Sequence, residues 1–320
     1  MRIAIDLRPL QIGHQNRGIG VYLLNLLNET PRNDDDIYIF LRYSNSNPIE
    51  EYGLGEGRQY KEVLYKKHSF SKHPVELFVY VWTSLLPNFS KVNRHRPDVF
   101  LQCDYLLGAP RGHCRVITVS YDLIPLKFRY LYLPPWKKYI GYRNLRLRSR
   151  ARLVFHALFY DRKYKNGIRL LKRSDKIISI SKNTTKDLVS MLNINEGKIK
   201  TIYLAASFRH GERDNIVRGE VKKLVDTIDV PYIVYIGATD RRRQIAELVH
   251  ALNLYNAFQA PLSMFLCGKE FRLESKSLDA KAKAAIEKSS YKHNIHLLGR
   301  ITEAEKNYIL QKAKAFVYPS

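Results

Sequence analysis

Apolar residues in the first two thirds of the chain follow two alternating patterns. Short continuous runs predict buried strands at 2–6, 37–42, 98–102, 115–120, 176–181 and 199–204. Apolar positions that recur every three or four residues predict helices at 18–29, 74–86, 153–173 and 184–192, the last with Asn183 as a candidate N-cap. Strands separated by helices predict a parallel sheet with right-handed crossovers.

A second series of the same kind follows a polar interruption. Residues 207–220 lack apolar periodicity, which is typical of a linker. Beyond them we expect strands at 232–236, 262–266, 295–298 and 315–318, and helices at 244–257, 279–288 and 303–312. The sequence therefore predicts an α/β protein of two doubly wound, Rossmann-like domains in tandem, at 1–206 and 226–320, joined by a linker at 207–225. In such sheets ligands bind at the carboxyl ends of the strands, and here we expect them between the domains.

Composition fits a folded protein in a reducing compartment. The 320 residues are 45% hydrophobic, which excludes wholesale disorder. Three cysteines, Cys103, Cys114 and Cys267, cannot all pair with one another and lack the spacing of a zinc site. The chain opens on a strand pattern rather than a signal peptide, and its most apolar run, 77–86, is shorter than the roughly 20 residues that span a bilayer. We therefore expect a cytoplasmic protein, soluble or peripheral on the inner face of the membrane.

The net charge is +24, from 54 lysines and arginines against 30 acidic residues. A field of this sign attracts nucleic acid, anionic lipid or a phosphorylated substrate. The alternative is that the charge only maintains solubility.

Three short motifs lie where predicted strands end. Gly18 and Gly20 open the first helix, where a bare backbone and free N–H groups suit a phosphate. The dinucleotide fingerprint needs a third glycine, and Leu23 stands at its position, so that cofactor is excluded and a simple turn is the alternative. Tyr121 and Asp122 follow the strand at 115–120, and Asp122 is either a sugar ligand or base, or a cap for the next segment.

The third motif is the run Arg241, Arg242 and Arg243 between the strand at 232–236 and the next helix. Guanidinium groups bind phosphates in a bidentate manner. Arginines at a helix N-terminus oppose the helix dipole, so the run needs another reason to exist, and a diphosphate supplies one. The alternative is a solvated charge run.

Together these segments resemble the group 1 family of retaining glycosyltransferases, which have the GT-B fold and are related in fold to glycogen phosphorylase. The likeness covers nearly the whole chain and depends on the order and spacing of IAIDLRPL, RGIGVY, VITVSYDLIPL, SDKIISISKNTTKDLV, KIKTIYLAAS, YIVYIGATDRRRQIAELVHAL and IHLLGRITEAEKNYILQKAKAFVYPS.

The resemblance implies that the second domain binds a nucleotide-sugar donor, such as GDP-mannose or a UDP-hexose, and that the first binds the acceptor. It implies transfer of a hexose to a glycan or lipid-linked acceptor in cell-surface polysaccharide synthesis, without a metal or other cofactor. The family's basic pair on the diphosphate corresponds to Arg242 and Arg243, its glycine-rich loop to Gly18 and Gly20, and its contact with the nucleobase edge to Arg300 and Ile301.

Two features depart from the family pattern. Tyr121 stands where many relatives have histidine, and a tyrosine cannot be a cation near pH 7. The family also continues beyond Tyr-Pro-Ser into a glycine-rich loop and a helix with two glutamates, whereas this sequence ends at Ser320. We therefore expect an incomplete second domain, an apolar sheet face left uncovered and little sugar transfer. A non-catalytic remnant that binds a glycan or a membrane is the alternative.

A basic stretch at 136–173 carries thirteen lysines and arginines against one acid, Asp161, with aromatic residues interleaved. Such a surface suits an anionic membrane, which fits a family with lipid-linked acceptors. Two alternatives are a solvated helix face and a module that binds the nucleic-acid backbone, although no nucleic-acid motif accompanies the stretch.

Overall fold

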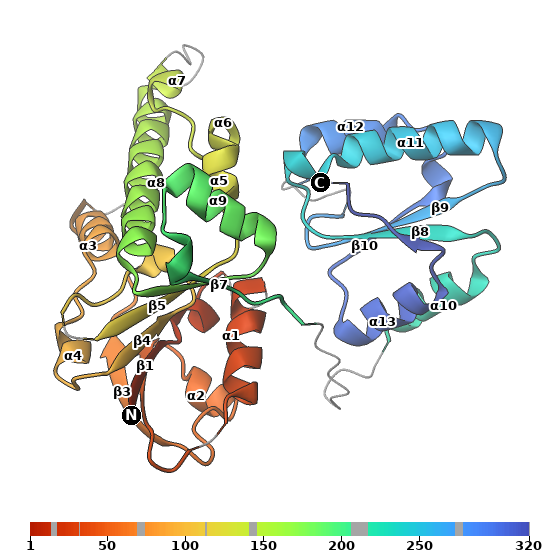
Figure 1. The fold of residues 1–320 in the computed structure, drawn as a ribbon. Helices are drawn as coiled ribbons and strands as arrows, with labels where there is room; N and C mark the ends of the chain where they lie inside the picture. The colour runs from red at the N-terminus through yellow and green to blue at the C-terminus, as the bar shows by residue number, and fades with distance from the viewer. Residues whose placement is uncertain are drawn as a thin grey trace. The chain divides into compact units, whose positions relative to one another are not determined.

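The computed structural model describes residues 1–13, 18–31, 33–68, 74–112, 114–140, 146–205, 217–272 and 278–319, with the backbone alone at 74–78 and 140. The chain divides into two compact units, Met1–Ser207 and Phe208–Ser320, which we call unit 1 and unit 2 (Figure 1). Each unit is built on its own parallel sheet, so the predicted pair of doubly wound α/β domains is confirmed as the fold class.

Unit 1 has a seven-stranded sheet in the order β3-β2-β1-β4-β5-β6-β7, with all neighbouring strands parallel. The strands are β1 (Arg2–Asp6), β2 (Ile37–Tyr43), β3 (Gln59–Tyr65), β4 (Val99–Gln102), β5 (Arg115–Ser120), β6 (Lys176–Ser179) and β7 (Ile199–Thr201). The winding direction reverses between β1 and β4, which makes their carboxyl ends a switch point. The sequence did not predict β3, because only Val63 of this edge strand is buried.

The helices of unit 1 lie on both faces of the sheet (Figure 1). Alternate strand residues face opposite cores: Tyr38 and Phe40 pack with helix α1, whereas Ile39 and Leu41 pack on the face that Leu170 of helix α8 covers. The helices are α1 (Gly18–Glu29), α2 (Pro48–Glu51), α3 (Pro74–Leu85), α4 (Ser90–Asn93), α5 (Ile124–Lys127), α6 (Arg129–Tyr132), α7 (Lys137–Ile140), α8 (Leu147–Arg173) and α9 (Lys182–Leu192), with 3-10 turns η1 (Arg8–Gln11), η2 (Tyr105–Leu107) and η3 (Glu196–Lys198).

Two helix starts differ from the sequence prediction. Helix α8 begins six residues before the predicted 153, in a run that is mostly polar and exposed. Helix α9 is capped by Ser181, whose hydroxyl accepts from the N–H of Thr184 at 3.1 Å, so the prediction that Asn183 caps it is wrong. Asn183 lies inside the first turn instead.

Unit 2 has a four-stranded parallel sheet in the order β10-β9-β8-β11. The strands are β8 (Tyr232–Ile236), β9 (Ser263–Cys267), β10 (Ile295–Gly299) and β11 (Ala315–Phe316), and the helices are α10 (Gly219–Thr227), α11 (Ile245–Phe258), α12 (Ala280–Glu287) and α13 (Glu303–Lys312), with 3-10 turns η4 (Arg241–Arg243) and η5 (Lys292–Asn294). Helices α11 and α12 cover one face, and α10 and α13 cover the other (Figure 1).

Helix α10 corrects two expectations. Residues 219–225, expected to be linker, are helical, because Val221, Leu224, Val225 and Ile228 recur at helical spacing and pack on the sheet. Residues 207–216 of the expected linker lie outside the described residues. With α10 in place both faces of the sheet are covered, so the expected bare face is absent from the described part of unit 2. Exposed apolar side chains remain at edge strand β11, where Phe316 is 52% exposed.

None of the helices within the described ranges is both long and apolar enough to cross a membrane.

Candidate functional site

Three glycines occupy the carboxyl edge of the sheet in unit 2. Gly237 follows β8, Gly268 follows β9 and Gly299 ends β10, and the Gly268 N–H donates to the Gly299 carbonyl at 2.8 Å. Gly268 has a φ of +154°, and a Cβ built on it would lie 2.0 Å from the Gly237 carbonyl oxygen. Only glycine fits there, so this edge presents backbone rather than side chains to an approaching ligand.

The predicted arginine run forms its own turn before the helix. Turn η4 spans Arg241–Arg243, the Asp240 carboxylate accepts from the Arg242 N–H at 3.2 Å, and Gln244 adopts a left-handed conformation (φ 51°) before α11 begins at Ile245. Gln244 makes no side-chain hydrogen bond that caps the helix. The first N–H groups of α11 therefore follow the arginine turn directly, and the start of this helix together with the arginines favours a bound anion.

The three arginines have different surroundings. Arg241 is 75% exposed and its Nε lies 3.6 Å from Asp279, whereas the Arg242 Nε lies 3.6 Å from its neighbour Asp240. The Arg243 guanidinium carbon lies 4.3 Å from the ring centre of Tyr318. A cation–π contact of this length positions Arg243 against the ring of Tyr318.

Tyr318 belongs to an aromatic stack at the same edge. Its ring lies parallel to the buried Tyr235 ring, at 5.6 Å between centres and 13° between planes. The Tyr235 hydroxyl donates to the Ala238 carbonyl at 2.7 Å, and a Cβ on Gly237 would lie 2.6 Å from that hydroxyl. The stack therefore fixes the loop after β8 as well as Arg243.

The Arg300–Ile301 turn is held by an ion pair between Arg218 and the buried carboxylate of Glu305. Arg218 Nη2 donates to the Arg300 carbonyl at 3.1 Å, and the same guanidinium donates to Glu305 through Nε at 2.5 Å and Nη2 at 3.1 Å. Glu305 is fully buried and completes a capping box with Thr302 at the start of α13. Burial raises the pKa of Glu305, but hydrogen bonds from Arg218 and Thr302 outweigh that effect and the pKa is lowered overall.

Arg272 adds a further cation that the sequence analysis missed. A Cβ on Gly299 would lie 2.9 Å from the Arg272 Nε, so this side chain passes over the end of β10 beside Arg300. The one indication in the sequence was that Arg272 comes shortly after β9, at the same edge of the sheet. The carboxyl edge of unit 2 therefore carries Arg242, Arg243, Arg272 and Arg300 around a bare glycine edge.

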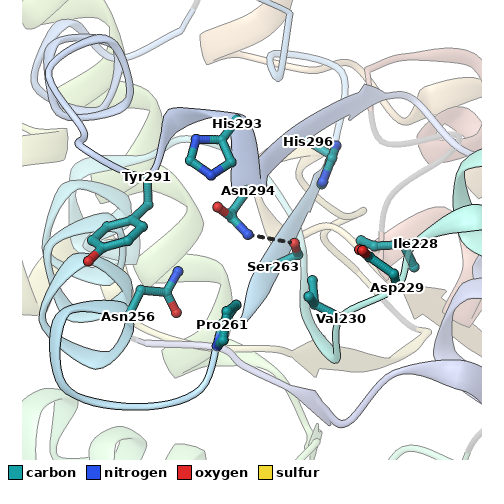
Figure 2. Close-up of a pocket in the computed structure, with 10 residues that line it drawn as sticks. All are labelled: Ile228, Asp229, Val230, Asn256, Pro261, Ser263, Tyr291, His293, Asn294 and His296. Carbon is teal, nitrogen blue, oxygen red and sulfur yellow. Dashed lines mark hydrogen bonds between the residues drawn. The ribbon is translucent and has the colours of Figure 1, made fainter.

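Unit 2 has one cavity beside this carboxyl edge and another at the opposite, amino edge of its sheet. One, of about 310 Å³, is lined by the arginine turn and the start of α11. Its two cations are matched, because Arg241 pairs with Asp279 and Lys281 with Glu247, and a third carboxylate, that of Asp240, also lines it. The other, of about 370 Å³, lies at the amino ends of β9 and β10, around Ser263, His293 and His296 (Figure 2). Neither has the unmatched positive charge that a diphosphate needs.

The remaining predicted residues belong to unit 1, at the carboxyl ends of β1 and β5. Gly18 is the first residue of α1, and an added Cβ there would meet nothing within 4 Å. Gly20 is buried in the first turn of the same helix, and Arg17 lies outside the described residues. The Tyr22 ring of α1 contacts the Tyr121 ring edge-to-face at 5.6 Å, so the glycine pair and the end of β5 are brought together.

Tyr121 and Asp122 have different surroundings. The Asp122 carboxylate accepts from the Ile124 N–H at 2.9 Å, which is the capping role that the sequence left open. The Tyr121 hydroxyl is buried and has no hydrogen-bond partner among the described residues. Burial, with Cys103 and Tyr22 nearby, raises the pKa of Tyr121, so the phenol stays protonated and can donate to a sugar but not act as a base at neutral pH.

The basic stretch at 136–173 separates into a buried and an exposed face. Phe159 and Tyr164 are buried in the core, so part of the aromatic interleaving reflects helix packing. Trp136, Leu147 and Tyr160 are exposed, as are most of the lysines and arginines. Residues 141–145 lie outside the described part.

Comparison with known proteins places the fold. No family model matches the chain, and no curated protein matches it. Among solved structures, sucrose-phosphate synthase from Thermosynechococcus elongatus aligns with a TM-score of 0.61 at 12% identity, over 100% of this chain and 75% of that one. HepE from Anabaena, in complex with UDP and glucose, aligns with a TM-score of 0.58 at 11% identity, over 99% and 74%. WaaG, a glycosyltransferase involved in lipopolysaccharide biosynthesis, aligns with a TM-score of 0.54 at 12% identity, over 99% and 75%. At such low identity the likeness is one of architecture, and this chain has the GT-B fold of these glycosyltransferases.

Proposed function

We propose that the chain is a glycosyltransferase that moves a hexose from a nucleotide-sugar donor, such as GDP-mannose or a UDP-hexose, to a glycan or lipid-linked acceptor of cell-surface polysaccharide synthesis. The observation that carries the proposal is the glycine edge of unit 2 with Arg242 and Arg243 beside the uncapped start of α11. The UDP and glucose bound to HepE, a protein of the same fold, support a nucleotide-sugar donor.

Each predicted residue has a role in this proposal. Arg242 and Arg243 stabilise the negative charge that develops on the leaving diphosphate, and Gly18 and Gly20 let the backbone approach it. The Arg300–Ile301 turn contacts the edge of the nucleobase, while Tyr121 and Asp122 bind sugar hydroxyls. We infer retention of the anomeric configuration by front-face attack, with the diphosphate charge held by side chains rather than by a metal.

Calorimetry with UDP and GDP tests the arginine turn. If Arg243 donates a charge-assisted hydrogen bond, Arg243→Ala should weaken nucleotide binding by roughly 1.5–3 kcal/mol. Arg241→Ala is the matched control from the same turn, because Arg241 is largely exposed and pairs with Asp279. Equal affinity in wild type and Arg243→Ala would reject the diphosphate site. A donor screen that weighs the products of transfer then identifies the sugar.

We further infer that the chain associates peripherally with an anionic membrane at the cytoplasmic face. Tyr130, Trp136 and Leu147 are exposed around helices α6, α7 and the start of α8, beside Lys137 and Lys138. Apolar side chains that enter the interface and lysines that attract acidic headgroups act together in such binding. Co-sedimentation with vesicles should increase with acidic lipid and decrease with salt, and binding that ignores both would overturn the inference.

A further inference from the structure

A cavity of about 560 Å³ lies at the carboxyl edge of unit 1, and none of the predicted site residues lines it. Its walls come from the residues after β1, the ends of β2 and β3, turn η2 after β4, and helices α3 and α8. Because the sheet reverses its winding between β1 and β4, the cavity lies at the switch point, where α/β sheets place their ligands.

The charged side chains described in the lining of this cavity are all basic. Among the described residues that line it, none is acidic and the basic ones are Arg8, Lys66, Lys67, His68 and Lys163. Lys67 is fixed at the rim, where its Nζ donates to the Gln11 carbonyl at 2.7 Å. A site without carboxylates and with several cations attracts an anion rather than a neutral sugar.

Arg8 lines the cavity but adds no net positive charge to it, because its charge is neutralised by Asp6. Its guanidinium forms a buried pair with Asp6, at 2.6 Å between Nη2 and Oδ2 and 2.8 Å between Nε and Oδ1. Its guanidinium carbon also lies 5.5 Å from the ring centre of Tyr65. The excess positive charge therefore comes from the lysines.

Lys163 is a partly buried lysine in this lining. It extends from the middle of α8 into the cavity lining, and no carboxylate of the described residues lies within 4.0 Å of its ammonium group. Its pKa is lowered by burial, an effect that Asp104 opposes and Arg8 reinforces. A partly desolvated cation is stabilised when an anion binds beside it.

Aromatic rings complete the lining. Tyr43, Tyr65 and Tyr80 form the walls, and Tyr160, 51% exposed, lies one turn before Lys163 on α8. Tyrosine rings offer apolar faces for the C–H face of a sugar and hydroxyls for its oxygens. A volume of 560 Å³ is in the range of small-molecule sites.

We propose that this cavity binds the acceptor of the transfer reaction, and that the acceptor carries a phosphate ester next to its sugar ring, held by Lys163. The assignment of this cavity to the acceptor rests on the proposed transferase function. The preference for a phosphate rests on the lining of the cavity alone. The phosphate ester is that of a soluble sugar phosphate or of a lipid headgroup, and the two sources are separated below.

Binding of hexose phosphates and of the parent hexoses is compared by calorimetry on the wild-type chain, Lys163→Met and Lys172→Met. Lys172 is an exposed lysine near the end of the same helix and outside the cavity, so it controls for net charge. In the second arm, phosphatidylcholine vesicles that contain a lipid with a phosphate-linked hexose headgroup are compared with vesicles that contain a glycolipid with the same hexose and no phosphate in its headgroup. We expect phosphate to strengthen binding in one arm by roughly 10- to 100-fold, the worth of a charge-assisted contact, and Lys163→Met alone to remove that gain.

A gain in the sugar arm assigns a soluble acceptor, and a gain in the vesicle arm assigns a lipid-borne one. No phosphate preference in either arm, or equal losses in Lys163→Met and Lys172→Met, overturns the inference. Thermal unfolding of both variants confirms that they fold. UDP and GDP binding is measured in parallel: if it persists while the phosphate preference is absent, only this inference fails, whereas its absence in the wild type counts against the proposed function.

Discussion

Replacement of Glu305 with glutamine tests how the Arg300–Ile301 turn is held. Each oxygen of this buried carboxylate accepts two hydrogen bonds: Oε1 from the Arg218 N–H and Nε, and Oε2 from the Thr302 N–H at 2.8 Å and Arg218 Nη2. An amide nitrogen cannot accept, so Glu305→Gln leaves two of these four donors without their acceptor in either orientation of the amide.

The magnitude follows from which donors lose a partner. Arg218 is 44% exposed and regains water, whereas a backbone N–H at the buried cap does not. An unsatisfied buried donor costs about 1–3 kcal/mol, and the loss of charge-assisted bonds adds roughly 1 kcal/mol, so we expect Glu305→Gln to destabilise unit 2 by about 2–4 kcal/mol. At roughly 4–8 °C per kcal/mol for a domain near this size, the melting temperature should fall by roughly 8–32 °C.

The pH dependence follows from the direction of the pKa shift. The pKa of Glu305 is lowered in the folded chain, so its carboxylate adds to the free energy of unfolding. This stabilisation is complete above the ordinary glutamate pKa of about 4.3, and it is lost as the pH falls through the lowered pKa. The difference in stability between wild type and Glu305→Gln should therefore be constant near neutral pH and shrink in acid.

Thermal unfolding followed by circular dichroism measures these effects, with Glu303→Gln as the control. Glu303 lies in the same first turn of α13 but is 75% exposed and pairs only with Lys306 among the described residues, so its replacement should change the free energy of unfolding by less than about 0.5 kcal/mol. Nucleotide affinity should fall in Glu305→Gln alone, because Arg218 no longer fixes the Arg300 carbonyl. Equal melting temperatures and equal nucleotide affinity in the two variants would refute the reasoning.

Three further substitutions test other positions of the candidate site. Gly268→Ala should destabilise unit 2 by at least about 3 kcal/mol in denaturant unfolding, because its Cβ would overlap the Gly237 carbonyl; a variant as stable as wild type would contradict the glycine edge. Gly18→Ala should keep its stability or gain up to about 1 kcal/mol, since the Cβ meets nothing, while donor affinity falls if a phosphate approaches this backbone; unchanged affinity counts against that contact. Tyr121→Phe removes a buried hydroxyl without a described partner, so stability should not fall, whereas turnover should; unaltered turnover would remove Tyr121 from the site.

Much of the fold could be predicted because most strands are buried on both faces. Such strands appear as continuous apolar runs, as in β8 and β9. The missed elements lie at edges or on the surface: β3 buries only Val63, and α10 buries only Val221 and Val225. Their few apolar positions are diluted by charged neighbours, so periodicity alone could not separate them from a linker.

The positions of candidate residues in the fold could be predicted where a motif directly follows a strand. Tyr121 directly follows β5 and Arg300 directly follows β10, as the motifs indicated. What the sequence could not supply is which cation has which neighbour. Arg241, Arg242 and Arg243 are adjacent in the chain, yet two pair with aspartates and the third lies over Tyr318, some 75 positions away in sequence. Lys163 was likewise one of thirteen basic residues in a stretch until the fold placed it in a cavity.

The two units differ in the chemistry at their sheet edges, and this difference makes a final prediction. The edge of unit 2 is bare backbone flanked by arginines, which suits a diphosphate that needs close approach and planar donors. The edge of unit 1 has a deep cavity of tyrosines and lysines, which suits a sugar ring with a single anionic group. UDP or GDP affinity should therefore fall in Arg243→Ala and stay unchanged in Lys163→Met, while the affinity for a phosphate-bearing sugar or vesicle should respond in the opposite way. If both variants weakened both ligands equally, the two edges would not be separate sites, and the assignment of donor to unit 2 and acceptor to unit 1 would have to be abandoned.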